Sequence, residues 1–130
     1  MAKILVDTDV IIDSFRRSNK KDTLLVKVFS QSKNIAFISL VTIAEIWAGK
    51  SMSGKEDLRV AEELLKNCHV LMSSIKTAKK AGTILRQTNY QLSFQSAQIA
   101  ALAIENKLAI LTLNQKDFKK VKGLKLFPLR

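Results

Sequence analysis

Short apolar runs alternate along this chain with segments whose apolar residues recur at helical spacing. The run at residues 4–6 is typical of a strand buried on both faces. Similar runs predict further strands at 35–38, 70–72, 108–112 and 124–127, with helices at 9–17, 22–33, 39–49, 55–67, 75–88 and 96–106. This alternation indicates an α/β fold, a three-layer sandwich around a mainly parallel central sheet.

Composition narrows the class of protein. A chain of 130 residues is long enough for one domain with its own core, so we expect a single domain over 1–130. Four Gly and one Pro argue against a loop-rich or all-β fold. A single cysteine, Cys68, excludes an intrachain disulfide and a multi-cysteine zinc site. Without a signal-peptide core or a membrane-length apolar run, the protein is expected in the cytoplasm and not in a membrane.

Basic residues outnumber acidic ones by 22 to 11, which gives a formal net charge of +11. They are spread along the whole chain. Such an excess favours polyanionic partners, either nucleic acid or an acidic protein, although a surface that only keeps the protein soluble has the same composition.

Polar residues follow the predicted strands at the points where ligands bind in parallel sheets. Asp7 comes directly after the first strand, where a buried carboxylate is costly unless it is hydrogen-bonded or bound to a cation. Glu45 is the only charge in the segment after the second strand, and Asn114 and Asp117 follow the strand at 108–112. Because ligands sit outside the carboxyl ends of strands, we expect one edge of the sheet to collect these groups. Taken alone, Glu45 also fits an ordinary exposed helix position.

Three segments together resemble the PIN-domain ribonucleases, and within them the VapC toxins. They are VDTDVIID at 6–13, ISLVTIAEIWAG at 38–49, and LSFQSAQIAALA followed by LAILTLNQKDF within 92–118. The resemblance implies hydrolysis of RNA phosphodiester bonds with Mg²⁺ or Mn²⁺. By position it implies a metal site of Asp7, Glu45 and Asp117, and substrate contacts from Thr112, Asn114 and Lys116. The nearby Lys50 and Lys119 are further candidates to grip RNA.

The chain departs from the family pattern at one position. The acid that usually precedes the Ala-x-Ile-Ala-Ala stretch is replaced by Ser96, which we count with Asp7, Glu45 and Asp117 among the catalytic positions. Serine can cap the helix as aspartate would, but its neutral hydroxyl is a weaker ligand for a hard cation. Asp9, Asp117 or a water held by Ser96 are possible replacements. A second metal ion could arrive with the substrate, but the sequence does not offer the four full carboxylates that would support it.

The resemblance also implies partners, namely a cognate antitoxin protein and a second copy of the chain in a homodimer. A different class of function competes with the nuclease, a PIN-fold protein that binds RNA or a protein without cleavage, and Ser96 favours it.

The start DTDVII also half-matches the haloacid dehalogenase phosphatases, but the late acidic pair of that family is missing. Cys68 and His69 are adjacent on a strand and so point to opposite faces, which argues against a nucleophile and its base.

Overall fold

The computed structural model describes residues 1–17, 22–30 and 32–129 of the chain. Its centre is a parallel sheet of five strands in the order β3-β2-β1-β4-β5. The strands are β1 (Lys3–Val6), β2 (Ile35–Ser39), β3 (His69–Leu71), β4 (Ala109–Leu111) and β5 (Lys125–Leu126). The predicted α/β fold with a parallel central sheet is confirmed.

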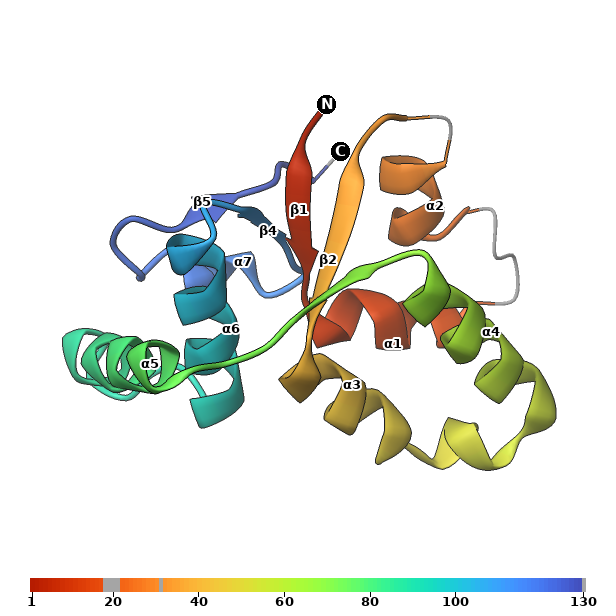
Figure 1. The fold of residues 1–130 in the computed structure, drawn as a ribbon, viewed down its shortest axis with the longest axis horizontal. Coiled ribbons are helices and arrows are strands. Elements are labelled where there is room, and N and C mark those ends of the chain that lie inside the picture. The colour runs from red at the N-terminus through yellow and green to blue at the C-terminus, as the bar shows by residue number, and fades with distance from the viewer. Residues whose placement is uncertain (18–21, 31, 130) are drawn as a thin grey trace.

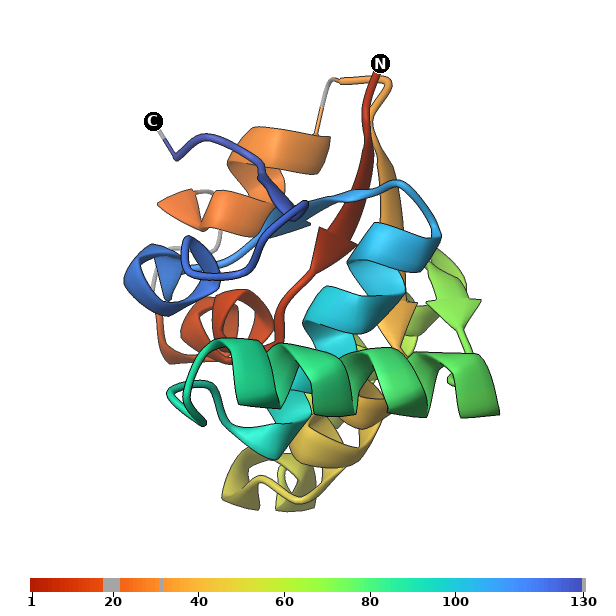
Figure 2. The ribbon, with the colours of Figure 1, turned by 90° about the vertical axis from the view of Figure 1, so that its left-hand side faces the viewer.

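Helices cover both faces of the sheet (Figure 1). One face carries α1 (Thr8–Arg16), α2 (Leu24–Phe29), α3 (Leu40–Trp47) and α4 (Lys55–Lys66), with a 3₁₀ turn, η2 (Lys50–Ser53), between the last two. The other face carries α5 (Ile75–Gln87), α6 (Phe94–Glu105) and the short α7 (Gln115–Phe118). Figure 2 shows α5 lying across α6, with the sheet behind them.

The central strand β1 divides its side chains between the two helical layers. Ile4 and Val6 pack in a core with residues of α1 and α3, including Ile11. Leu5 packs in a second core with α5 and α6, including Ile99. All three β1 side chains are at most 1% exposed, as expected for a strand covered on both faces.

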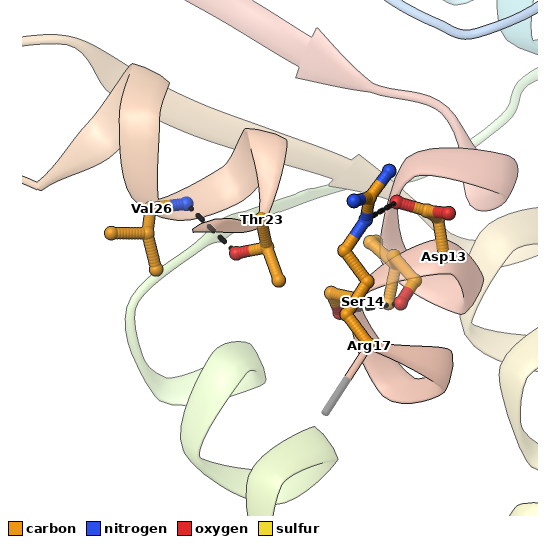
Figure 3. A network of polar contacts seen from close by, with 6 residues as sticks. Asp13, Ser14, Arg17, Thr23 and Val26 are labelled. Atoms are coloured by element: carbon orange, nitrogen blue, oxygen red, sulfur yellow. Dashed lines mark hydrogen bonds and ion pairs between the residues drawn. The ribbon is translucent and has the colours of Figure 1, made fainter. Parts of the chain in front are cut away.

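Helix starts differ from the prediction at three places. Asp7 caps α1, so this helix begins before residue 9. Thr23, rather than Asp22, caps α2 by accepting the Val26 N–H, as Figure 3 shows beside the Asp13–Arg17 ion pair at the end of α1. The expected cap of α6 is also wrong, because Ser93 Oγ accepts the Ser96 N–H at 3.0 Å and Ser96 lies inside the first turn. Each of these helices is preceded by several Ser, Thr or Asp residues whose side-chain oxygens could cap it. The hydrophobic pattern of the sequence does not decide which of them does.

The short elements were the hardest to predict. The four-residue α7 and the 3₁₀ turn at Lys50–Ser53 are each about one turn long, too short for an apolar stripe to repeat. Within the described ranges, no helix combines the length and the apolar character that crossing a membrane requires.

Candidate functional site

The carboxyl ends of β1, β2 and β4 deliver polar side chains to one cleft of about 220 Å³. Each strand continues into a turn or helix that carries one wall: α1 follows β1, α3 follows β2, and Asn114 follows β4. The first turn of α6 closes the remaining side. The cleft is lined by Asp7, Thr8, Asp9, Ile12, Glu45, Ser93, Gln95, Ser96, Ile99 and Asn114.

Asp7 is the most buried acid of the cleft, with 6% of its surface exposed. Its Oδ1 accepts the Thr8 N–H at 2.8 Å, and its Oδ2 accepts the Thr112 hydroxyl at 2.7 Å. The first bond caps α1, which also places the carboxylate beside the positive end of that helix. Thr112 is fully buried, so it holds Asp7 in place from the end of β4. Thr112 therefore does not make the expected contact with substrate, because its side chain does not reach solvent.

The electrostatics of the cleft oppose the charge on Asp7. Burial and the nearby carboxylate of Asp9 raise the pKa of Asp7 to about 7, with a smaller contribution from Glu45. The hydrogen bonds from Thr112 and Thr8 act in the opposite sense and lower the pKa. Burial and the neighbouring carboxylates together therefore disfavour the charged form of Asp7 more strongly than the protein's own donors favour it.

Glu45 is held by hydroxyl groups rather than by a basic residue. Thr8 Oγ1 donates to Glu45 Oε1 at 2.7 Å and lies 2.9 Å from Thr42 Oγ1. Thr42 is in turn joined to Ser39, the cap of α3, whose Oγ accepts the Thr42 N–H at 3.0 Å. These contacts connect the ends of β1 and β2 and orient Glu45 toward the cleft, so Glu45 is not the solvated residue of the alternative reading.

Asp9 also faces the cleft, on the first turn of α1. Its Oδ1 accepts the Leu113 N–H at 3.2 Å, and its Oδ2 lies 3.4 Å from Thr112 Oγ1. The contact with the chain after β4 places it beside Asp7. Among the two carboxylates considered as replacements for the missing acid, Asp9 is the one that lines the cleft.

Asp117 lies outside the lining. Its Oδ2 accepts the Asn114 Nδ2–H at 3.1 Å, and its Oδ1 is 3.6 Å from Lys120 Nζ. In the part of the chain that the structure describes, no three His, Cys, Asp or Glu side chains form a set that could hold a metal ion. The expected set of Asp7, Glu45 and Asp117 is thus not assembled here, because the Asp117 side chain contacts Asn114 just before α7 and Lys120 just after it.

The other expected positions are spread between the cleft and the surface. Ser96 and Asn114 line the cleft, whereas Lys116 is exposed on α7 and does not line it. The side chain of Lys50 lies outside the described residues. Sequence reasoning missed Thr8, Ser93 and Gln95; the hydroxyl directly after Asp7 at a helix start was the signal for Thr8.

Residues 4–124 match the PIN domain family, so the chain belongs to that family. A search of curated proteins finds no match.

Solved structures share the fold at low sequence identity. A chain in the DNA-bound VapBC2 structure from Rickettsia felis has a TM-score of 0.80 at 20% identity, covering 98% of this chain and 99% of that one. A chain of DNA-bound VapBC from Salmonella typhimurium gives 0.78 at 22% identity, covering 98% of each. A toxin-antitoxin complex from Klebsiella pneumoniae gives 0.73 at 22%, covering 93% of this chain and 94% of that one. The five-stranded α/β fold is shared with all three.

Proposed function

We propose that this protein is a metal-dependent endoribonuclease that hydrolyses phosphodiester bonds of RNA in the cleft around Asp7. One observation carries the proposal: a nearly buried carboxylate, with two further carboxylates along the same cleft and no basic residue among the described residues that line it. Such an arrangement is unfavourable unless a proton or a cation balances it. Membership of the PIN family supports reading the balancing charge as a metal ion.

The donors of the cleft fit a hard divalent cation. Mg²⁺ is commonly held by one or two carboxylates together with waters and substrate phosphates, and does not require a complete cage of protein ligands. Asp7 and Glu45 are the carboxylates we assign to it, and Asp9 adds a third negative charge to the lining of the same cleft. Bound there, Mg²⁺ or Mn²⁺ would supply a water of lowered pKa and stabilise charge on the phosphate.

The chain's own residues then orient the site. Thr112 and the Thr8 N–H hold both oxygens of Asp7, while the Thr8 hydroxyl holds Glu45. Ser96 and Asn114 offer neutral donors to a phosphate or to a water from opposite walls. Lys116 and Lys119, exposed on and beside α7, are placed to attract the RNA backbone, so activity should fall as salt rises.

We also propose that the protein is the toxin component of a toxin-antitoxin pair, acts in the cytoplasm, and forms a homodimer. The structural neighbours support the antitoxin partner, since they come from VapBC and toxin-antitoxin complexes. The sequence segments quoted above support the same assignment.

A second function is favoured by one observation, the serine at position 96 where the family pattern has an acid. With one charge fewer, the cleft would bind metal weakly, and the protein would bind RNA or a partner without cutting. The repulsion at Asp7 argues against this reading, because a metal-free site of this kind destabilises the fold at neutral pH.

Calorimetric titration with Mn²⁺ tests whether the cleft binds a metal ion. The native protein should bind Mn²⁺ and Asp7→Asn should not, whereas Asp117→Asn should retain binding because Asp117 lies outside the cleft. Absence of binding to the native chain would refute the metal site. An RNA cleavage assay with Ser96→Asp then distinguishes the two functions: activity that appears only in this variant would establish the silent binder.

A further inference from the structure

Two grooves meet at the carboxyl end of α6, away from the cleft. The larger, about 470 Å³, is lined by Lys76, Lys79, Lys80 and Thr83 of α5 with Ile104 and Glu105 of α6. The smaller, about 170 Å³, is lined by Ala103, Ile104, Lys107, Leu108, Gly123 and Lys125. Because both include Ile104, we treat them as one surface and call it the lysine groove, defined by Lys76, Lys79, Lys80, Lys107 and Lys125.

The positive charge of the lysine groove is not balanced by nearby acids. Glu105 is its only acidic lining residue, and Glu105 Oε1 is already hydrogen-bonded by the Thr77 hydroxyl at 2.6 Å. Salt bridges among the described residues join Asp13 to Arg17, Glu56 to Arg59 and Asp117 to Lys120, and none of them involves a groove lysine. The groove therefore has a strong local excess of positive charge.

This placement of lysines opposes the stability of α5. Lys76 lies in the first turn, where the helix dipole disfavours a cation, and no acidic residue shares that turn. Lys79 and Lys80 follow it at the i+3 and i+4 spacings, at which like charges on a helix repel. An anion bound in the groove would relieve both effects.

The groove lies within reach of a chain bound in the cleft. Ser96, in the first turn of α6, lines the cleft, and Ile104, near the other end, lines the groove. Eight residues of helix separate them, a rise of about 12 Å. Figure 2 shows α5 crossing in front of α6, and both helices contribute lining residues to the larger groove. Six of the seven residues between Ser96 and Ile104 are buried, so a strand would pass beside α6 rather than over it. Since a stacked strand advances about 3.4 Å per nucleotide, at least about four nucleotides are needed to span this distance.

We propose that the lysine groove binds the phosphate backbone of an RNA segment that flanks the one in the cleft. This inference rests on the proposed function. Lys79 and Lys80 both lie about one turn of α5 beyond Lys76, which extends the positive charge along the groove, and lysine binds phosphate as a point charge. None of the described residues that line the two grooves is aromatic, so this surface offers no platform for stacking bases. The groove grips RNA without reading its sequence.

Fluorescence anisotropy with two single-stranded RNAs, of about 3 and about 20 nucleotides, tests the groove across a series of salt concentrations, because only the longer RNA can span the cleft and the groove. The test variant is Lys76→Gln/Lys79→Gln/Lys80→Gln. Its matched control, Lys33→Gln/Lys55→Gln/Lys66→Gln, removes the same charge from exposed lysines outside the groove, in α4 and between α2 and β2. The corresponding triple Arg variant keeps the charge. All binding measurements are made in EDTA, so that the proposed nuclease leaves the RNA intact, and cleavage of the short RNA is measured separately with Mn²⁺.

For the longer RNA, the Gln variant of the groove should flatten the slope of log affinity against log salt by about 2, since each single-strand phosphate contact contributes about 0.7. At 0.1 M salt this corresponds to a loss of about a hundredfold in affinity. The Arg variant should bind as the native protein does, and binding of the short RNA should change little. Thermal unfolding should show that the Gln variant is at least as stable as the native chain.

Equal losses in the groove variant and in its control would overturn the proposal, because they would reflect net charge alone. An unchanged slope in both would overturn it too. Tighter binding of poly-glutamate than of RNA at the groove, lost in the Gln variant, would assign the groove to an acidic protein instead. A different result would contradict the proposed function: native protein that neither binds nor cleaves the short RNA.

Discussion

Removing the charge of Asp7 should make the metal-free protein more stable at high pH. In the folded protein, burial, Asp9 and Glu45 raise the pKa of Asp7 from 3.8 to about 7. The folded state thus holds this proton more tightly than the unfolded chain does. The resulting contribution to stability is fully present below about pH 4 and is lost as the pH rises through about 7.

A pKa difference of this size corresponds to at most about 4 kcal/mol between the two ends of that range. Asp7 is 6% exposed, so little of the effect is screened by solvent. In Asp7→Asn the titration is absent, but the amide nitrogen that replaces Oδ2 cannot accept the hydrogen bond from the Thr112 hydroxyl, at a cost of about 1 kcal/mol. We therefore expect the variant to be slightly less stable than the native protein at pH 4 and about 2–3 kcal/mol more stable at pH 8.

Urea unfolding in EDTA, followed by the fluorescence of Trp47, the only tryptophan, measures this difference at each pH. Asp13→Asn serves as the control, because it removes a carboxylate outside the cleft that is paired with Arg17. The control should keep the pH dependence of the native protein. If Asp7→Asn lost stability between pH 4 and pH 8 as steeply as the native chain, the repulsion assigned to the cleft would be refuted.

Three further predictions concern the scaffold. Ser93→Ala should lower the free energy of unfolding by about 1 kcal/mol, whereas Ser96→Ala should change it by less than about 0.5, since Ser93 and not Ser96 caps α6. Urea unfolding of both variants measures these changes. A larger loss for Ser96→Ala than for Ser93→Ala would show that Ser96 is the cap. Phe118→Ala should cost about 3–5 kcal/mol in the same assay, because this side chain is 1% exposed in the core beside α6; a cost below about 1 would mean that α7 is not docked there. Burial raises the pKa of the Cys68 thiol to about 11, so alkylation of Cys68 by iodoacetamide should be slow at pH 8 and should become faster in urea. Rapid alkylation of the folded protein would contradict the burial of Cys68.

The sequence predicted the sheet and its functional edge well, for a physical reason. Runs such as residues 4–6 are apolar throughout because both faces are covered, and a carboxylate directly after such a run marks the end of the strand. Parallel strands bring those ends to one edge, so Asp7, Glu45 and Asn114 meet in one cleft. Local pattern and topology were enough to bring these three together.

The remaining features depend on three-dimensional contacts that the pattern does not encode. Asp117 matched the family motif, yet its carboxylate is held by Asn114 and faces Lys120. Thr8 was overlooked because its role depends on the approach of α3, which brings Glu45 within 2.7 Å of its hydroxyl. The cap of α6 was misplaced because Ser93 and Ser96 are equivalent as sequence signals. Side-chain partners across elements decided each of these cases.

The most direct test of the proposed nuclease is cleavage of RNA by the native protein with and without Mn²⁺. The account predicts cleavage with Mn²⁺ that EDTA abolishes, loss of that activity in Asp7→Asn, and its retention in Asp117→Asn. Native protein that binds Mn²⁺ and RNA yet leaves the RNA intact would contradict the account.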